Sequence, residues 1–559
     1  MLSLHPLLQM NNSRAWKSSS IILSQMVVAC MAALLLLWGL GTPYLWQDEA
    51  ATAVLAQRML RLGRPLAYDG VNLITIDHWA AEEKATIDQR TRDPQAAINY
   101  YVRRGDMKAD TAWIWQPWGQ FVVAALSFKT LGATTLAARL PFALASIATV
   151  LILYRFVLTY FEHAQMALLA SVFLVFNAYW ILHSRQCRYY SLSSLFLVLT
   201  LASYARWQWG GRWGAALFVI TAWCWFQVDY GTVWPALGVL FADAVVAQRR
   251  SLWRPTLVGG VLGAAIAPFA YYYELWGRHS IPASPWHERF MRNLLNVNEY
   301  VVPVLIVGVA IAVSVHRRKT LPVAERRLVV IACAIFVVLL FWVPAVAPGP
   351  LLRYVIIMAP VGCLLVAWVL VRLGGSQPRV FTWAAAAMFL LTPWLSLPLS
   401  LPLHVMHRAK YRGATVFRFE LEVLRRSVFG HRADPNRLVA DWLKQNAAAD
   451  DEILINYEDI PLMFYLPNPI RGGVAAFRVE DDAKRPPDFV VLRHSVAEFG
   501  HWPVYDREVQ RYAWTPVPLQ APDVHWGNCP DPIAQEEDPA HAQSIYIARR
   551  VVGQGTPVP

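Results

Sequence analysis

The chain has 559 residues, of which 56% are hydrophobic and only 16% are charged, and its mean hydropathy is +0.34. This composition is too apolar for an ordinary soluble globule. The net charge of +12 does not indicate a nucleic-acid partner, because much of the Lys and Arg lies in short loops between apolar runs. We therefore expect a polytopic α-helical membrane protein.

Eleven apolar runs fill most of the first 402 residues, and each is near the length that crosses a hydrocarbon core. They cover residues 20–45, 140–160, 164–182, 190–206, 211–228, 231–248, 255–276, 298–315, 328–347, 354–371 and 380–402. A further run at 117–132 holds about sixteen residues, fewer than the roughly 20 that a spanning helix needs. The sequence thus predicts about eleven transmembrane helices and leaves the run at 117–132 doubtful.

The charges of the loops favour one topology. With a cytoplasmic N-terminus and no span at 117–132, the cytoplasmic loops hold the basic clusters at 249–254 and 317–319, as the positive-inside rule requires. A span at 117–132 would place both clusters outside. We therefore predict that 117–132 is a juxtamembrane helix on the outer face, and that the C-terminal part of the chain is extracytoplasmic.

The chain divides into an apolar part and a polar part. Residues 1–402 are predicted to form the transmembrane domain, with a long outer loop at 46–139, and residues 403–552 an extracytoplasmic α/β domain. Its expected elements are a helix at 435–446 and strands at 452–456, 488–493 and 544–548. The basic stretch from Arg408 to Arg426 is expected on lipid headgroups, and the tail 553–559 is expected to be disordered.

Two adjacent acids, Asp48 and Glu49, follow directly after the first apolar run. Acids favour helix N-termini for electrostatic reasons alone, so capping is one interpretation. The other is a general base at the membrane surface, which accepts a proton from an attacking hydroxyl. Neighbouring helical residues point about 100° apart, so one acid would face the site and the other would support it. Asp69, in a Tyr-Asp-Gly turn of the same outer loop, is a further candidate for substrate contact, although such a pair is usually a simple turn.

Several arginines lie at the predicted outer edge of the membrane, against the usual bias. They are Arg139, Arg185 and Arg188 with the adjacent Tyr189, and Arg353 with Tyr354 after a stiff Pro-Gly-Pro turn. Snorkelling to lipid headgroups would explain each arginine singly. Their common side of the membrane favours recognition of a phosphate that belongs to the substrate, for which the guanidinium fork is suited.

Metal and disulfide signatures are absent from the sequence. The six Cys form no CxxC pair and have no metal-like spacing to His, so we expect neither a disulfide framework nor a zinc site. No cofactor is indicated with certainty. A divalent metal at Asp48 and Glu49 stays open, because two carboxylates are too few to define a site.

These motifs together resemble the GT-C superfamily of integral membrane glycosyltransferases, in the bacterial branch similar to protein O-mannosyltransferases and lipid A aminoarabinose transferases. The resemblance covers about residues 40–400. It is carried by the Asp48-Glu49 pair, the proline-led helix from Pro117, the segments 138–141 and 184–192, and the late Arg353-Tyr354.

The resemblance implies an inverting transfer of a sugar from a polyprenyl-phosphate donor. It implies a base or acceptor-positioning role for Asp48, with Glu49 as its partner, and contacts to the lipid phosphate for Arg353, Arg139 and Arg188. The chain departs from many relatives at Gln116-Pro117-Trp118, where they have His-Pro-Pro, and in a long charged insert at about 80–112.

The sequence leaves two other functions open. A transporter or flippase of lipid-linked sugars would be expected to show charged or broken helices near the bilayer midplane and inverted repeats. A non-catalytic envelope protein that binds polyprenyl phosphate would be expected to lack the acidic pair. In all cases we expect a bacterial inner-membrane protein whose partners are membrane lipid, a polyprenyl-phosphate sugar and an acceptor lipid, glycan or protein, the sugar and the acceptor being undetermined.

Overall fold

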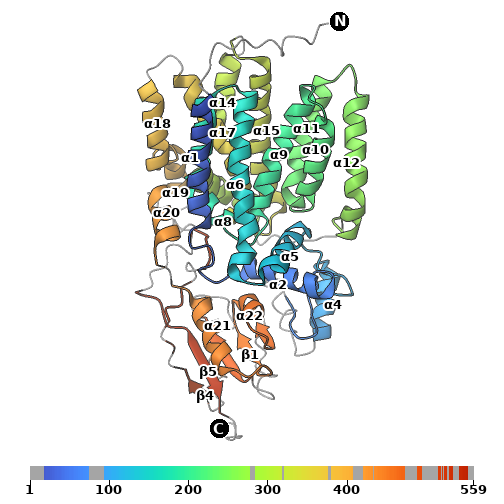
Figure 1. The fold of residues 1–559 in the computed structure, drawn as a ribbon, viewed down its shortest axis with the longest axis vertical. Coiled ribbons are helices and arrows are strands. Elements are labelled where there is room, and N and C mark those ends of the chain that lie inside the picture. The colour runs from blue at the N-terminus through green and yellow to red at the C-terminus, as the bar shows by residue number, and fades with distance from the viewer. Residues whose placement is uncertain are drawn as a thin grey trace.

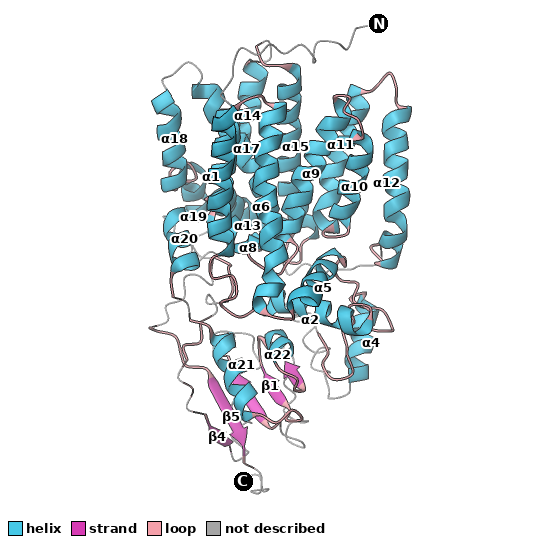
Figure 2. Cartoon of the chain, in the orientation of Figure 1, coloured by secondary structure: helices cyan, strands magenta, loops and turns pink. Residues whose placement is uncertain are grey.

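A helical bundle, a layer of short helices beneath it and a small sheet domain follow one another along the long axis of the molecule (Figure 1). The computed structural model describes residues 18–74, 94–276, 284–317, 320–374, 379–406, 419–431, 433–472, 487–493, 514–517, 519, 521–524, 528–532 and 540–551. Among the described residues, strands occur only at the end of the molecule that holds the C-terminal elements (Figure 2). The chain is a multi-pass membrane protein with a small C-terminal sheet domain, as the sequence predicts.

The bundle contains most of the apolar runs. Its long helices are α1 (Ser18–Leu37), α6 (Thr135–Tyr160), α9 (Tyr190–Gln208), α10 (Gly214–Phe226), α11 (Tyr230–Ala247), α12 (Trp253–Tyr272), α15 (Val323–Val346) and α17 (Ala359–Leu373). Shorter or bent pieces complete it: α7 (Ala164–Val175), α8 (Ala178–Ser184), α13 (Trp286–Asn296), η1 (Val297–Val301), α14 (Leu305–His316), α16 (Leu352–Val355), η2 (Ile356–Met358), α18 (Arg379–Leu391) and α19 (Leu397–Met406).

The expected count of about eleven spanning helices is not confirmed. Among the described residues, five helices are long and apolar enough to cross a membrane, or up to seven if each of two bent pairs is one span. The count falls because several predicted runs end early or break. The run at 20–45 is helical only to Leu37, and the run at 380–402 is divided between α18 and α19 around Pro393, which cannot continue a helix.

At the helix breaks inside the bundle, asparagine side chains form hydrogen bonds with backbone groups that the breaks leave free. The pair α7 and α8 bends by 67° at Asn177, and the segment 286–301 meets α14 at 79° next to Pro303. Asn177 caps α8 at Trp180 N and donates to Val301 O, each at 2.8 Å. Asn298 in turn donates to Ser396 O at 2.8 Å, in the break between α18 and α19. Backbone groups freed at each break therefore find partners within protein, as an apolar environment requires.

The layer beneath the bundle is formed by α2 (Gln47–Leu62), α4 (Pro94–Arg104) and α5 (Gly119–Leu131) (Figure 1). The run at 117–132 is thus a helix beside α2 and outside the bundle. A hydrogen bond of 3.2 Å from Thr52 Oγ1 to Gln120 joins α2 to α5. Gly119 starts α5 against the backbone of Gln227, where an added Cβ would lie 2.5 Å from the carbonyl oxygen, so only glycine fits.

The C-terminal domain is a five-stranded sheet with helices, in the strand order β2-β1-β3-β5-β4. Its strands are β1 (Ile453–Ile455), β2 (Ile470–Gly472), β3 (Phe489–Leu492), β4 (Trp514–Pro516) and β5 (Tyr546–Arg550). The strand β1 pairs in parallel with β2 and β3, whereas β5 pairs antiparallel with β3 and β4. The helix α21 (Pro435–Asn446) has the predicted bounds, and α22 (Asp459–Tyr465), β2 and β4 were not expected from the sequence.

Two apolar cores hold the molecule together. One fills the bundle, and includes Leu424 of α20 (Glu420–Leu424) and Val428 of η4 (Arg425–Phe429). The other runs without interruption from α2 and α5 into the sheet domain, and includes Val54, Phe128 and Ile460. The sheet domain is therefore fixed on the layer that carries the acidic pair. Most of the predicted basic stretch, residues 80–93 of the 80–112 insert and the tail 553–559 lie outside the described residues.

Candidate active site

Asp48 and Glu49 stand in the first turn of α2, where the chain leaves α1 and enters the layer beneath the bundle. Negative charge is favourable there because the first N–H groups of a helix are free. Neither acid caps the helix, since the N-cap position is Trp46 and it makes no side-chain cap. The two carboxylates therefore have other partners, and these partners differ.

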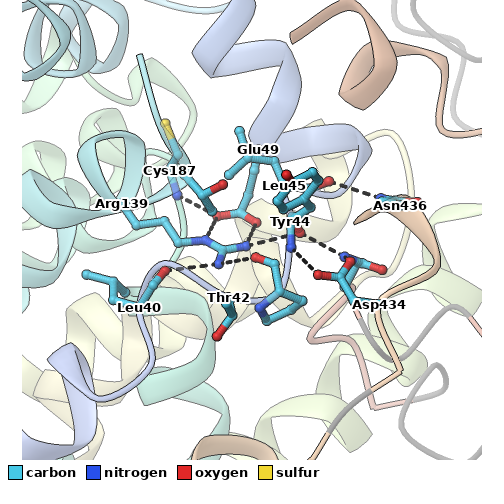
Figure 3. Close-up of polar contacts among 12 residues, drawn as sticks. Leu40, Thr42, Tyr44, Leu45, Glu49, Arg139, Cys187, Asp434 and Asn436 are labelled. Carbon is cyan, nitrogen blue, oxygen red and sulfur yellow. Dashed lines mark hydrogen bonds and ion pairs between the residues drawn. The ribbon is translucent and has the colours of Figure 1, made fainter. Parts of the chain in front are cut away.

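Glu49 is fully buried in a bidentate ion pair with Arg139 of α6 (Figure 3). Arg139 Nε and Nη2 lie 2.8 and 2.6 Å from the two carboxylate oxygens of Glu49. Arg139 Nη1 donates to Pro43 O at 2.7 Å and to Leu40 O at 3.2 Å, in the turn between α1 and α2. Every nitrogen of this guanidinium is thus engaged within the protein. The pair fixes the start of α2 against α6.

Asp48 faces a different arginine. Its Oδ2 lies 3.3 Å from Arg353 Nη1, and the same nitrogen lies 3.3 Å from Asp531 Oδ2 of the C-terminal domain. The second contact is a hydrogen bond, whereas the first is an ion pair only. The guanidinium also stacks over the rings of Trp46 and Tyr354, at 5.4 and 5.6 Å from their centroids. Side chains from three distant parts of the chain therefore meet at Arg353.

Arg188 also contacts the first turn of α2. Its Nη1 donates to the carbonyl oxygen of Asp48 at 2.9 Å and to Thr52 Oγ1 at 3.1 Å. Its Nε is buried and has no hydrogen-bond partner among the described residues. His183 Nε2, also buried, makes no hydrogen bond there either, and lies 3.6 Å from Asp531 Oδ1. Two buried nitrogens next to Arg353 thus lack a full set of partners.

Tyr189 and Cys187 lie next to the residues of this cluster. The rings of Tyr189 and Tyr190 are tilted by 56° with their centroids 4.6 Å apart, and the Arg188 guanidinium lies 6.0 Å from the centroid of the Tyr189 ring. The backbone N–H of Cys187 donates to Glu49 Oε1 at 2.9 Å. Burial raises the pKa of the Cys187 thiol well above its usual value, so this cysteine is not a thiolate nucleophile at neutral pH.

Two sequence-predicted residues lie apart from this cluster. Arg185 donates to Leu35 O and Trp38 O, each at 2.5 Å, and so closes the C-terminal end of α1. Asp69 forms an ion pair with Arg58 at 3.2 Å. Arg58 stands ten residues after Asp48 in α2, so the two residues are roughly 15 Å apart along the helix axis. Burial would raise the pKa of Asp69, but Arg58 and the N–H groups of Asn72 and Val71 lower it below its usual value.

No family model matches the sequence, and no curated protein matches it. Solved structures do match. The crystal structure of ArnT from Cupriavidus metallidurans bound to undecaprenyl phosphate superposes with a TM-score of 0.56 at 13% identity, over 97% of this chain and 100% of that one. Its apo state gives a TM-score of 0.55 at 13% identity, over 97% and 99% of the two chains. The chain has the fold of ArnT. The GT-C fold expected from the sequence is thereby confirmed.

Sequence-distant residues of this chain meet at or beside Arg353, and two of them, Asp531 and His183, were not expected from the sequence. Asp531 stands between two prolines, Pro530 and Pro532, in a domain without a recognisable motif. The two prolines restrict the backbone on either side of Asp531, and they are the signal that could have drawn attention to it. His183 is the first residue of the outer segment from which Arg185 and Arg188 were selected. Among the described residues of this ArnT-like chain, no group of three His, Cys, Asp or Glu could hold a metal ion.

Proposed function

We propose that the chain is a glycosyltransferase that moves a sugar from a polyprenyl-phosphate donor to an acceptor at the outer face of the membrane, with inversion. The observation that carries the proposal is the 3.3 Å approach of Asp48 Oδ2 to Arg353 Nη1. A carboxylate able to take a proton and a guanidinium able to hold a phosphate meet at one point. The ArnT structure bound to undecaprenyl phosphate supports a polyprenyl phosphate as the lipid partner.

The donor phosphate is proposed to lie between Arg353 and Arg188. Both guanidinium groups flank Asp48, and the Nε of Arg188 is buried without a hydrogen-bond partner among the described residues. A phosphate oxygen would supply the missing acceptor. The guanidinium of arginine suits a phosphate better than the ammonium of lysine does, because its planar fork of N–H groups matches two phosphate oxygens. Tyr189 and Tyr354, which lie against Arg188 and Arg353, would hold the two guanidinium groups in place.

The reaction follows from this placement. An acceptor hydroxyl gives its proton to Asp48 as its oxygen attacks the anomeric carbon, and the bond from that carbon to the phosphate oxygen breaks. The lipid leaves as a phosphate monoester, which gains negative charge during the reaction. Arg353 and Arg188 then stabilise the transition state more than the bound donor, which is the requirement for catalysis. A positioned base contributes about 10²–10⁴-fold.

Glu49 and Arg139 are assigned to the support of this site. Because Arg139 already uses Nε, Nη1 and Nη2 on Glu49 and on backbone carbonyls, we propose that it positions α2 and does not take the phosphate. The adjacent acids thus divide the work, with Asp48 toward the reacting groups and Glu49 toward α6. Arg185 and Asp69 are likewise proposed to stabilise their local structure.

The outer face is proposed from charge and arrangement. The α2 layer and the sheet domain lie at the same end of the bundle (Figure 1). Basic loops such as 249–254 and 317–319 are predicted to be cytoplasmic by the positive-inside rule. We therefore propose that the site, residues 46–139 and the C-terminal domain are extracytoplasmic in the bacterial inner membrane.

The test is Asp48→Asn, which keeps the shape of the side chain and removes the base. We expect folded protein that binds undecaprenyl phosphate yet transfers sugar at least about 100-fold more slowly. The assay is transfer from the lipid-linked sugars of the native membrane, with donor and acceptor identified by the intermediates that accumulate in a deletion strain. Normal transfer by this variant would remove the proposed base.

The same strain separates the alternatives. A transporter or flippase of lipid-linked sugars would leave the sugar on its lipid and change only the leaflet in which it is found. A non-catalytic polyprenyl-phosphate protein would bind the lipid and leave no accumulated acceptor. Loss of a transferase should make unmodified acceptor and donor increase together with the donor in the outer leaflet, whereas loss of a flippase should trap the donor in the inner leaflet. The nature of the sugar and whether the acceptor is a lipid, glycan or protein follow from the same measurement.

A further inference from the structure

We propose that Asp531 of the C-terminal domain is a positioning residue of the donor site, whose carboxylate occupies on Arg353 the place that the donor phosphate takes when it binds. The inference rests on the proposed function. It goes beyond it by giving the C-terminal domain, which carries no recognisable motif, a direct part in donor binding.

The hydrogen bonding of Arg353 carries the argument. Its Nη1 donates to Asp531 Oδ2 at 3.3 Å, while Asp48 at the same distance makes no hydrogen bond with it. Nη1 carries two hydrogens, and the one that is given to Asp531 becomes available to a phosphate oxygen only when Asp531 withdraws, whereas Asp48 need not move. Asp48 stays beside the site, where the proposed reaction needs it.

Charge balance leads to the same conclusion. Asp48 and Asp531 carry two negative charges, and Arg353 and Arg188 carry two positive charges, so this group of four is neutral when all are ionised. A phosphodiester brings one further negative charge and meets the repulsion of both carboxylates. Withdrawal of Asp531 removes one of them, and leaves the positive charge of Arg353 for the phosphate.

The segment that bears Asp531 is held close to the acidic pair. Asn528 donates to Tyr44 O at 2.8 Å and to Asp434 Oδ1 at 2.9 Å. Cys529 packs in a small apolar cluster with Trp46, the residue over which Arg353 stacks. The position of Asp531 is thus set by the same turn that presents Asp48. His183 Nε2, at 3.6 Å from the other carboxylate oxygen, is the group toward which Asp531 can turn when it leaves Arg353.

The experiment measures the binding of undecaprenyl phosphate to purified full-length protein by native mass spectrometry, at fixed salt. Asp531→Asn should bind the lipid roughly 5-fold more tightly, because one nearby negative charge is removed. Asp531→Glu, which keeps the charge, should stay close to the wild type. The matched control is Asp441→Asn, which removes a carboxylate that accepts from Tyr44 Oη at 2.9 Å in the same domain interface, away from Arg353. It should leave lipid binding unchanged.

The kinetic constants KM and kcat provide a second test, because a merely structural role of Asp531 predicts a different change in them. Asp531→Asn should lower KM for the donor and also lower kcat, because the phosphate product leaves more slowly from an uncontested Arg353. A structural role predicts a lower kcat with KM unchanged or raised. If Asp531→Asn does not fold, Asp531→Ala with a thermal melt serves the same comparison.

The outcomes separate this inference from the proposed function. Equal or weaker lipid binding by folded Asp531→Asn overturns the inference, while loss of binding in Arg353→Ala would still support the phosphate site. If Arg353→Ala binds undecaprenyl phosphate as well as the wild type does, the proposed phosphate site itself is lost.

Discussion

Glu49 and Arg139 form a bidentate ion pair, with Nε to Oε1 at 2.8 Å and Nη2 to Oε2 at 2.6 Å, in which both side chains are buried. The neighbouring Asp48 is partly exposed and ion-paired with Arg353. Two adjacent carboxylates of the same α2 turn thus face different surroundings. This difference is the basis for the proposal that Glu49 holds the site and Asp48 acts in it, and it can be measured.

The first prediction compares Glu49→Gln with Asp48→Asn. Glu49→Gln leaves Arg139 buried without its counter-charge, which costs about 3–5 kcal/mol of folding free energy. Asp48→Asn removes only a partly exposed contact and should change the thermal midpoint little. Thermal melts and transfer assays on the same preparations check both. A Glu49→Gln protein as stable as the wild type would contradict the structural role of the pair. The double variant Glu49→Gln with Arg139→Met should recover part of the loss, since it removes the unpaired charge as well.

The second prediction compares Arg185 with Arg188, two arginines that lie three positions apart. Arg185→Ala takes two donors from the last turn of α1 and should lower stability by about 1–3 kcal/mol, with lipid binding unchanged per folded molecule. Arg188→Ala should instead weaken binding of undecaprenyl phosphate by roughly 10- to 100-fold. Lipid titrations and melts on both variants distinguish the two roles. The reverse assignment would follow if Arg185→Ala lost the lipid and Arg188→Ala kept it.

Much of the architecture was predictable because it depends on local pattern. The apolar runs, the helix at 435–446 and a helix at 117–132 that stays outside the bundle follow from composition, length and loop charge. The number of spans was not predictable, because the breaks at Asn177 and between α18 and α19 depend on partners elsewhere in the bundle.

Sequence position identified Asp48 and Arg353 as candidates, and the fold brings them together. The sequence could not show with which side chain each of these charged residues pairs. Which acid of the pair would face Arg139 depends on how α2 rotates against α6, which is set by packing over the whole layer. Asp531 could not be found by pattern either, since 178 positions separate it from Arg353 and only the docking of the sheet domain joins them.

The third prediction concerns pH and the Arg58–Asp69 pair. Burial lowers the pKa of Arg58 to about 10, yet Arg58 remains charged at neutral pH. The pKa of Asp69 is below its usual 3.8 in the folded protein, so its stabilising effect is complete above that value and is lost as the pH falls through the lower, folded pKa. Asp69→Asn should therefore melt at a lower temperature than the wild type at pH 7. The difference should close when melts are repeated in steps below pH 4. A difference that stays constant down to the acid limit would show that charge is not its source.

The last prediction concerns the docking of the sheet domain on α2. Gln47, next to Asp48, donates from Nε2 to Asp459 Oδ1 at 2.7 Å and accepts from Ile460 N at 3.3 Å, so it joins the start of α2 to the start of α22. Gln47→Leu removes both hydrogen bonds from a buried contact and should cost about 1–3 kcal/mol. Because the same turn carries Asp48, this variant should also lose transfer activity per folded molecule.

Asn72 provides the matched control for Gln47→Leu. It makes the same kind of buried contact to the sheet domain, donating to Asn468 O at 3.0 Å and accepting from Ile470 N at 2.7 Å, but it lies beyond the far end of α2. Asn72→Leu should lose a similar amount of stability and keep its transfer rate per folded molecule, because Asp48 and Arg353 stay in place. Equal activity in the two variants would mean that the docking of the domain does not position Asp48. A loss of transfer activity in Gln47→Leu but not in Asn72→Leu would show that the side chain of Gln47 couples the docking of the C-terminal domain to the position of Asp48.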